Sequence, residues 1–136
     1  DTVFSCGQHY RRKEPPEIYF TFVDLGKTIK NNVAEFLNRQ ISGIESIVWA
    51  TSDNNSTKKE NHSGGLGLKL IKEFIELNNG ILQIVSANGV WELNRGTILT
   101  NQISIDFPGT FVTLVFNLKD KQQYFMKDEI NLDNIF

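Results

Sequence analysis

Ser63-Gly64-Gly65-Leu66-Gly67-Leu68 opens the strongest helical pattern in this chain of 136 residues. Glycines at a helix start let a ligand approach the backbone closely, and the free N–H groups and the helix dipole favour an anion such as phosphate. The spacing does not fit a P-loop, and the dinucleotide fingerprint needs a small residue where Leu70 stands. A glycine-rich loop that only turns the chain is the competing interpretation.

The helix after this loop is predicted from the spacing of its apolar residues. Its buried stripe is expected to consist of Leu70, Ile71, Phe74, Ile75 and Leu77. Two i,i+4 ion pairs, Lys69–Glu73 and Lys72–Glu76, are expected on the solvent side. Asn79-Gly80 is typical of a helix end.

Upstream of this helix, the pattern predicts two strands and two shorter helical segments. The strands cover residues 3–8 and 18–24, and Pro15-Pro16 lies in the turn between them. Large residues on both faces of 18–24 predict a strand that is covered on both sides. Asn31 or Asn32 is expected to cap the first helix, and Gly43 weakens the second, around residues 41–48.

Two segments differ from their surroundings in composition. Residues 51–63 contain no large apolar residue and are expected to form a surface loop. Further strands are predicted at 81–87 and 111–118, separated by a turn and a hairpin at 88–108 with strand-like runs near 91–93 and 103–107. We therefore expect one domain over residues 1–118 and a polar tail over 119–136.

Charge and cysteine content limit the classes of function. The formal net charge is −2 with a pI near 5.7, and no basic stripe of a nucleic-acid binder is present. No apolar run approaches the ~20 residues of a membrane helix. The single cysteine, Cys6, excludes an internal disulfide and favours a cytoplasmic location. Cys6, His9 and His62 are too far apart in sequence to indicate a metal site.

Three short stretches together resemble the motifs of the GHKL ATPases, the superfamily of DNA gyrase, histidine kinases and MutL. Asp24-Leu25-Gly26-Lys27-Thr28-Ile29 is similar to the D-x-G-x-G motif that ends a strand. Residues 63–68 are similar to the G-x-G-L-G-L loop, and Gly109-Thr110-Phe111 is similar to the G-T that starts the last strand. Taken alone, Asp24 is better explained as a helix cap and Gly109-Thr110-Phe111 as a plain turn into a strand. The resemblance covers about residues 3–118, and the stretch from Gly65 to Ser86 is most similar to the histidine-kinase ATP-binding domain.

The resemblance implies a fold and a set of ligand contacts. The fold is an α+β two-layer sandwich of the GHKL (Bergerat) type, with a mixed, mostly antiparallel sheet and helices on one face. Asp24 would accept the adenine amino group, Gly26 would let the base approach, and Thr110 would support Asp24 and a water. The N–H groups of Gly64, Gly65, Leu66, Gly67 and Leu68 would hold the phosphates of ATP, and residues 51–63 would form the lid. Lys58, Lys59 and His62 are more simply explained as solvated side chains.

The sequence also departs from the family pattern. Thr28 and Ser63 replace glycines of the first and second motifs, and both remain candidates for the binding site because they are small. The family places a helix with a Mg²⁺-binding asparagine, and in hydrolases a catalytic glutamate, upstream of the strand at 3–8. We therefore expect a fragment that lacks this helix, its Mg²⁺ ligand and its general base, so that no catalytic residue is assigned.

Two functions are consistent with these observations. The first is the ATP-binding domain of a cytoplasmic histidine-kinase-like or regulatory ATPase, with Mg²⁺ as the accompanying metal and weak nucleotide binding by the fragment. The second is a degenerate GHKL-fold module that binds a protein partner or associates with itself, without nucleotide turnover.

Overall fold

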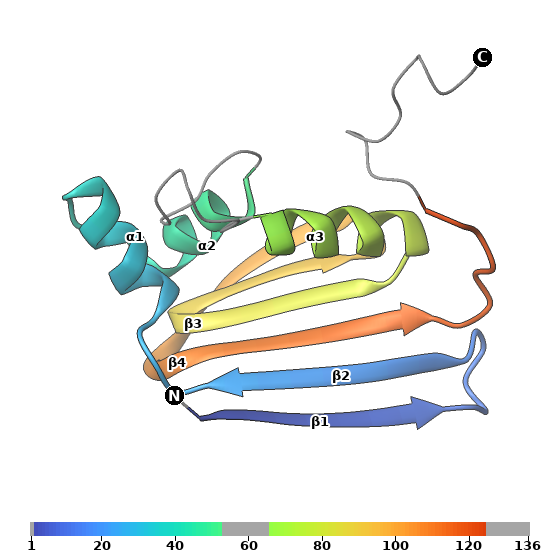
Figure 1. Ribbon diagram of the computed structural model, residues 1–136. Coiled ribbons are helices and arrows are strands. Elements are labelled where there is room, and N and C mark those ends of the chain that lie inside the picture. Colours follow the sequence, from blue (N-terminus) through green and yellow to red (C-terminus); the bar gives the residue numbers. More distant parts are fainter. Residues whose placement is uncertain (1, 53–65, 125–136) are drawn as a thin grey trace, which may run out of the picture.

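The computed structural model describes residues 2–52 and 66–124, which form an antiparallel sheet with helices on one face (Figure 1). The strands are β1 (Val3–Tyr10), β2 (Glu17–Asp24), β3 (Ile81–Asn94) and β4 (Thr97–Asn117). The helices are α1 (Ile29–Leu37), α2 (Gly43–Thr51) and α3 (Leu66–Asn78). The fold class is therefore α+β, as the sequence predicts.

The strand order is β1-β2-β4-β3, and each pairing between described strands is antiparallel. The expectation of a mixed sheet is thus wrong for the described residues. Tight turns explain two of the pairings: β1 and β2 are joined by the predicted proline turn, and β3 and β4 by a hairpin. The long-range pairing of β2 with β4 places Asp24 directly opposite Thr110.

The two short helices begin at side-chain caps. The Thr28 hydroxyl accepts a hydrogen bond from Asn31 N, so Thr28 caps α1 and the prediction of Asn31 or Asn32 as the cap is wrong. Thr28 is extended, with φ −68° and ψ 156°, and helical geometry begins at the next residue. Ser42 and Glu45 form a reciprocal capping box at the start of α2.

Gly43 does more than weaken the start of α2, because it makes a close backbone approach to β3. A Cβ atom on Gly43 would lie 2.5 Å from Asn88 Oδ1 and 2.6 Å from Gly89 N. A Cβ on Gly89 would lie 2.4 Å from the carbonyl carbon of Gly43. Two glycines therefore allow the first turn of α2 to pack directly against the β3 backbone.

The buried face of α3 differs from the predicted stripe. Ile75 is buried and Phe74 and Leu68 pack against the core, but Leu70, Ile71 and Leu77 are exposed. Glu73 is buried, so the predicted solvent-side position of the Lys69–Glu73 pair is also wrong. Lys72 Nζ donates to the carbonyl of Thr51, 3.3 Å away, and so links α3 to the end of α2. The periodicity identified the helix, but the face that is buried was decided by how α3 lies on the sheet.

As predicted, α3 stops before Asn79, which has φ 57°.

Residues 88–108 extend β3 and β4 into a ribbon that folds back at the bulge near Ala87. Arg95 and Gly96 form the tip, with φ 46° and 86°, which suits a two-residue hairpin turn. Arg95 N donates to the carbonyl of Gly80 at 3.0 Å, so the tip returns to the beginning of β3. Figure 1 shows β3 reversing its direction at the end of the sheet where β2 ends. The predicted separate turn and hairpin are thus one continuous ribbon.

The core lies between the sheet, the helices and the inner side of this ribbon. Trp91 and Leu93 on the ribbon are 2% and 1% exposed. They belong to a cluster that also contains Ile47, Ile75, Leu82, Ile84 and Leu114. In β2, Phe20 packs against this core, but Phe22, which points to the same face two residues further on, is exposed, so the predicted full coverage of this strand is wrong.

The first residues of the predicted tail make contacts with the domain. The Tyr124 ring packs edge-on against Phe74, with centroids 4.8 Å apart. The Asn78 side chain bonds the backbone of Asn117 in both directions, at 3.1 Å and 2.7 Å. The end of α3 is thereby fixed to the end of β4.

Candidate functional site

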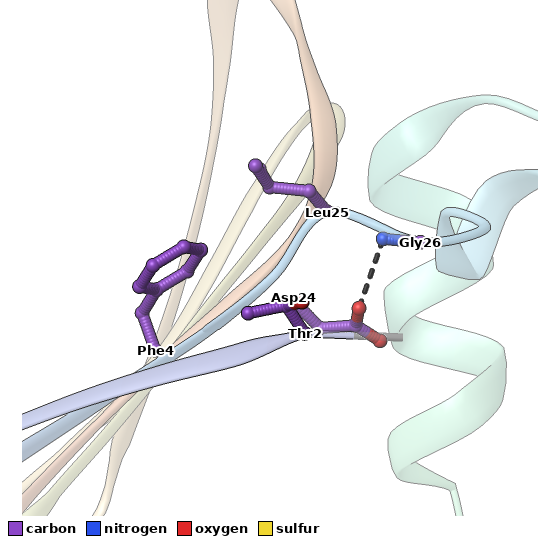
Figure 2. A pocket seen from close by; sticks show the side chains of 5 residues that line it. All are labelled: Thr2, Phe4, Asp24, Leu25 and Gly26. Atoms are coloured by element: carbon purple, nitrogen blue, oxygen red, sulfur yellow. Dashed lines mark hydrogen bonds between the residues drawn. The ribbon is translucent and has the colours of Figure 1, made fainter.

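Asp24 is the last residue of β2, and its carboxylate is held by the turn that follows. Gly26 N donates to Asp24 Oδ1 at 2.9 Å (Figure 2). A Cβ on Gly26 would lie 3.0 Å from that same oxygen, so a side chain there would press on the carboxylate. No hydrogen bond to a described residue reaches Oδ2, which leaves one half of this half-buried carboxylate free to accept a hydrogen bond from a ligand.

Asp24, Thr110 and Ser86 lie side by side in one cross-strand row. Asp24 is opposite Thr110, and Thr110 is opposite Ser86 on β3. Directly opposite residues of an antiparallel sheet present their side chains on the same face. The row therefore collects a carboxylate and two hydroxyl groups at the helix-covered face of the sheet.

Ser86 is the site residue that the sequence analysis missed. It is fully buried, and its Oγ accepts from Ile29 N at 2.9 Å and donates to the carbonyl of Gly109 at 3.1 Å. The Thr110 hydroxyl lies 3.2 Å from the same oxygen. Ser86 thus joins the start of α1 to the segment that precedes the last part of β4. A small polar residue inside an apolar strand was the available signal.

The predicted support of Asp24 by Thr110 is therefore indirect in this structure. The Thr110 hydroxyl forms a hydrogen bond with Ser86. Thr110 and Asp24 are related only as directly opposite residues of neighbouring strands. Gly109 explains how the two segments come so close: a Cβ there would lie 2.0 Å from the carbonyl oxygen of Asp24. A glycine before Thr110 is needed because β4 passes directly against the end of β2.

A hollow of about 360 Å³ lies at the ends of β1 and β2, lined by Thr2, Phe4, Asp24, Leu25 and Gly26. Pockets for small molecules are typically about 300–1,000 Å³. Figure 2 shows the Asp24 carboxylate turned toward Gly26, while Phe4 and Leu25 project from the other side of the strand pair. The hollow is thus lined by Asp24 and Gly26 together with apolar residues, while the Asp24 carboxylate itself turns toward Gly26 and away from Phe4 and Leu25.

The predicted phosphate loop is described only in part. Leu66 and Gly67 form the first residues of α3, and Leu68 packs against the core. A Cβ on Gly67 would meet nothing within 4 Å, so the backbone there is open to approach. The first turn of α3 lies on the half of the molecule where β2 ends (Figure 1). Ser63, Gly64 and Gly65 lie outside the described residues, as do Lys58, Lys59, His62 and all of the predicted lid beyond Ser52.

Charges near the site are few and are paired locally. The Lys27 ammonium forms an ion pair with Glu35 of α1. Within residues 2–52 and 66–124, no three His, Cys, Asp or Glu side chains gather as a metal site requires. None of the helices in the described parts of the chain has the length and apolarity to cross a bilayer.

Comparison of the chain with models of protein families, with curated proteins and with solved structures finds no match.

Proposed function

We propose that this chain binds ATP with its adenine at Asp24, as the nucleotide-binding domain of a histidine-kinase-like or regulatory ATPase. The observation that carries the proposal is the Asp24 carboxylate, one oxygen of which is fixed by Gly26 N while the other accepts no protein hydrogen bond from described residues. A carboxylate held in this way is a fixed acceptor for an exocyclic amino group. Adenine offers such a donor at this position, whereas guanine offers a carbonyl oxygen.

The surroundings of Asp24 support the same ligand. Gly26 leaves the backbone beside the carboxylate without a side chain, and Gly109 lets β4 pass against the Asp24 backbone carbonyl. Thr110 and the buried Ser86 complete the polar row beside it. Of the three motifs, the first lines the hollow and Gly109 of the third lies against the Asp24 backbone. The second motif leads into α3, and the free N–H groups at a helix start suit phosphates.

Mg²⁺ would accompany the nucleotide and neutralise its phosphates. The described residues add no carboxylate cluster for the metal. In this proposal, the described residues around Asp24 bind and orient the nucleotide. Positioning and charge stabilisation are the main demands of phosphoryl transfer.

A second candidate is a protein-interaction module without nucleotide turnover. The observation in its favour is the apolar surface of α3, where Leu70, Ile71 and Leu77 are exposed. Exposed apolar side chains gathered on one element are a common feature of interaction sites. This function needs neither the free Asp24 oxygen nor the glycine-rich loop.

Calorimetric titration with ATP and GTP, each with Mg²⁺, distinguishes the two candidates. The native chain is expected to bind ATP and to show no heat with GTP. In Asp24→Asn, Gly26 N still requires an oxygen, so the amide nitrogen faces the adenine amino group, donor against donor. The loss of a charge-assisted hydrogen bond corresponds to about 1.5–3 kcal/mol, or roughly 10- to 150-fold in affinity.

Glu76→Gln is the matched control, because Glu76 is an exposed carboxylate on α3 and the substitution also converts carboxylate to amide. It is expected to bind ATP like the native chain. A folded native chain that gives no heat with ATP, alone or extended upstream, would contradict nucleotide binding and favour the interaction module. Equal binding by Asp24→Asn and the native chain would show that the adenine is not at Asp24.

A further inference from the structure

One side of β4 between Thr97 and Gln102 is a free sheet edge. Within the described residues, this part of β4 pairs only with β3, from Asn94–Thr97 to Gly89–Gln102. The pairing with β2 is confined to Thr110–Asn117. Residues 97–102 are all exposed. The outer side of the ribbon therefore carries backbone donors and acceptors that no described strand uses.

The register of the ribbon identifies which backbone groups face outward. In a two-residue hairpin, the pair that closes the turn exchanges both hydrogen bonds, and this pair is Asn94–Thr97. Hydrogen-bonded and non-hydrogen-bonded pairs then alternate along an antiparallel ladder. Ile98, Thr100 and Gln102 consequently direct their N–H and C=O groups away from β3.

This edge lacks the features that normally prevent strand pairing. Edge strands are usually protected by charged side chains, prolines or bulges. Residues 96–105 contain neither a charged residue nor a proline. Ile98 and Leu99 are 52% and 51% exposed, on opposite faces of the ribbon. The backbone of this edge is thus unpaired with any described strand, although the Gln102 N–H donates to Asn101 Oδ1 at 2.8 Å, and its side chains are uncharged, with Ile98 and Leu99 apolar.

We propose that two copies of this chain associate through this edge, as antiparallel strands with a two-fold axis at Thr100. Thr100 then lies opposite the partner's Thr100, and Ile98 lies opposite the partner's Gln102. Leu99 lies diagonal to the partner's Leu99, within reach of apolar contact. The outward N–H and C=O groups of Ile98 and Thr100 and the C=O of Gln102 find their partners in the second copy, while the Gln102 N–H exchanges its bond to Asn101 Oδ1 for one to the partner strand.

A second copy fits this edge because the segment is complementary to itself. Uncharged strands meet without the repulsion that opposes pairing of like-charged edges, and Thr–Thr pairs are favourable across antiparallel strands. Antiparallel self-pairing is two-fold symmetric, so the edge is used up in a closed dimer. This inference does not rest on the proposed nucleotide function, because the ribbon edge and Asp24 are separate features.

Analytical ultracentrifugation over a range of protein concentrations tests the proposal, with the native chain, Thr100→Lys and Thr100→Asp. Each variant alone places two like charges opposite one another at the axis. We expect each to raise the dimer dissociation constant about tenfold or more, equivalent to about 1.4 kcal/mol. An equimolar mixture of the two is expected to restore association, which a folding defect cannot do. Gln122→Lys is the control, since it adds the same charge at an exposed position outside the edge.

A cysteine at the axis gives an independent readout. In a Cys6→Ser background, Thr100→Cys is expected to form a disulfide-linked dimer on mild oxidation, because opposed residues of a hydrogen-bonded pair lie about 5.5 Å apart at Cα. A native chain that stays monomeric at every concentration overturns the proposal. A mixture of Thr100→Lys and Thr100→Asp that associates no better than either variant alone also overturns it.

Discussion

Ser86 Oγ accepts a hydrogen bond of 2.9 Å from the backbone N–H of Ile29, a residue that lies 57 positions earlier in the chain. The same side chain donates to the Gly109 carbonyl. One buried hydroxyl therefore connects α1, β3 and the final part of β4 at the point where Asp24 ends β2. The candidate site depends on this connection as much as on the motif residues.

Ser86→Ala is expected to lower the free energy of unfolding by about 1–3 kcal/mol, because it leaves the buried N–H of Ile29 without an acceptor. Urea denaturation measures the change. Ser5→Ala is the matched control, since Ser5 is exposed on β1 and its replacement should stay within about 0.5 kcal/mol. Equal effects of the two substitutions would contradict a structural role for Ser86.

Glu17 gives the fold a dependence on pH. It is 2% exposed, and its carboxylate contacts Lys13 at 2.7 Å and Arg95 at 2.8 Å. Burial raises the pKa of Glu17, but the hydrogen bonds from Lys13, Tyr19 and Arg95 outweigh this effect and hold the pKa below its usual value of 4.5. Because the pKa is lower in the folded state, the stabilisation is present above pH 4.5 and is lost as the pH falls through the folded-state pKa.

Glu17→Gln is therefore expected to be less stable than the native chain at pH 7 by about 1–3 kcal/mol. The difference should shrink as the pH is lowered from 4.5 through the folded-state pKa of Glu17, because below that pKa both proteins carry a neutral side chain at this position. Thermal unfolding at a series of pH values measures both quantities. A stability difference that is constant with pH would show that the ion pairs of Glu17 contribute nothing.

Replacement of Gly43 and of Gly67 by alanine is expected to change the free energy of unfolding in opposite directions. Gly43→Ala places a Cβ within 2.6 Å of the Gly89 backbone and should destabilise the fold by about 1–3 kcal/mol. Gly67→Ala lies in α3 with nothing within 4 Å, and should stabilise it by about 0.5–1 kcal/mol. Chemical denaturation of both variants checks these signs. If the proposed function holds, Gly67→Ala also weakens ATP binding in calorimetry, although the protein is more stable.

The ribbon is expected to be part of the core, which Trp91→Ala tests. Trp91 is 2% exposed and packs in the same cluster as Ile47 and Leu82. Its truncation should cost about 3–5 kcal/mol. Leu99→Ala, on the exposed face of the same ribbon, should cost less than about 1 kcal/mol as long as the chain is kept dilute. A small loss of stability in Trp91→Ala would mean that the ribbon does not contribute to the core.

Local signals predicted the elements of this protein well. The proline turn, the strand that ends at Asp24 and the helix stop at Asn79-Gly80 all lie where the sequence placed them. Each depends on residues within a few positions of one another, such as the positive φ of Asn79. The errors concern faces and partners: Leu70, Ile71 and Leu77 were assigned to the core, and Ser86 was overlooked.

The sequence by itself therefore determined which segments form helices, strands and turns, and where β2 and α3 end. It also indicated Asp24, the glycine-rich loop and Gly109-Thr110 as the candidate site. Only the tertiary structure decided that the hairpin folds back at Ala87, that Trp91 and Leu93 complete the core, and that Ser86 joins three segments. The physical reason is the range of the interactions. Caps and turns are set by neighbouring residues, whereas the face that a helix or ribbon buries depends on surfaces formed by residues far away in the chain.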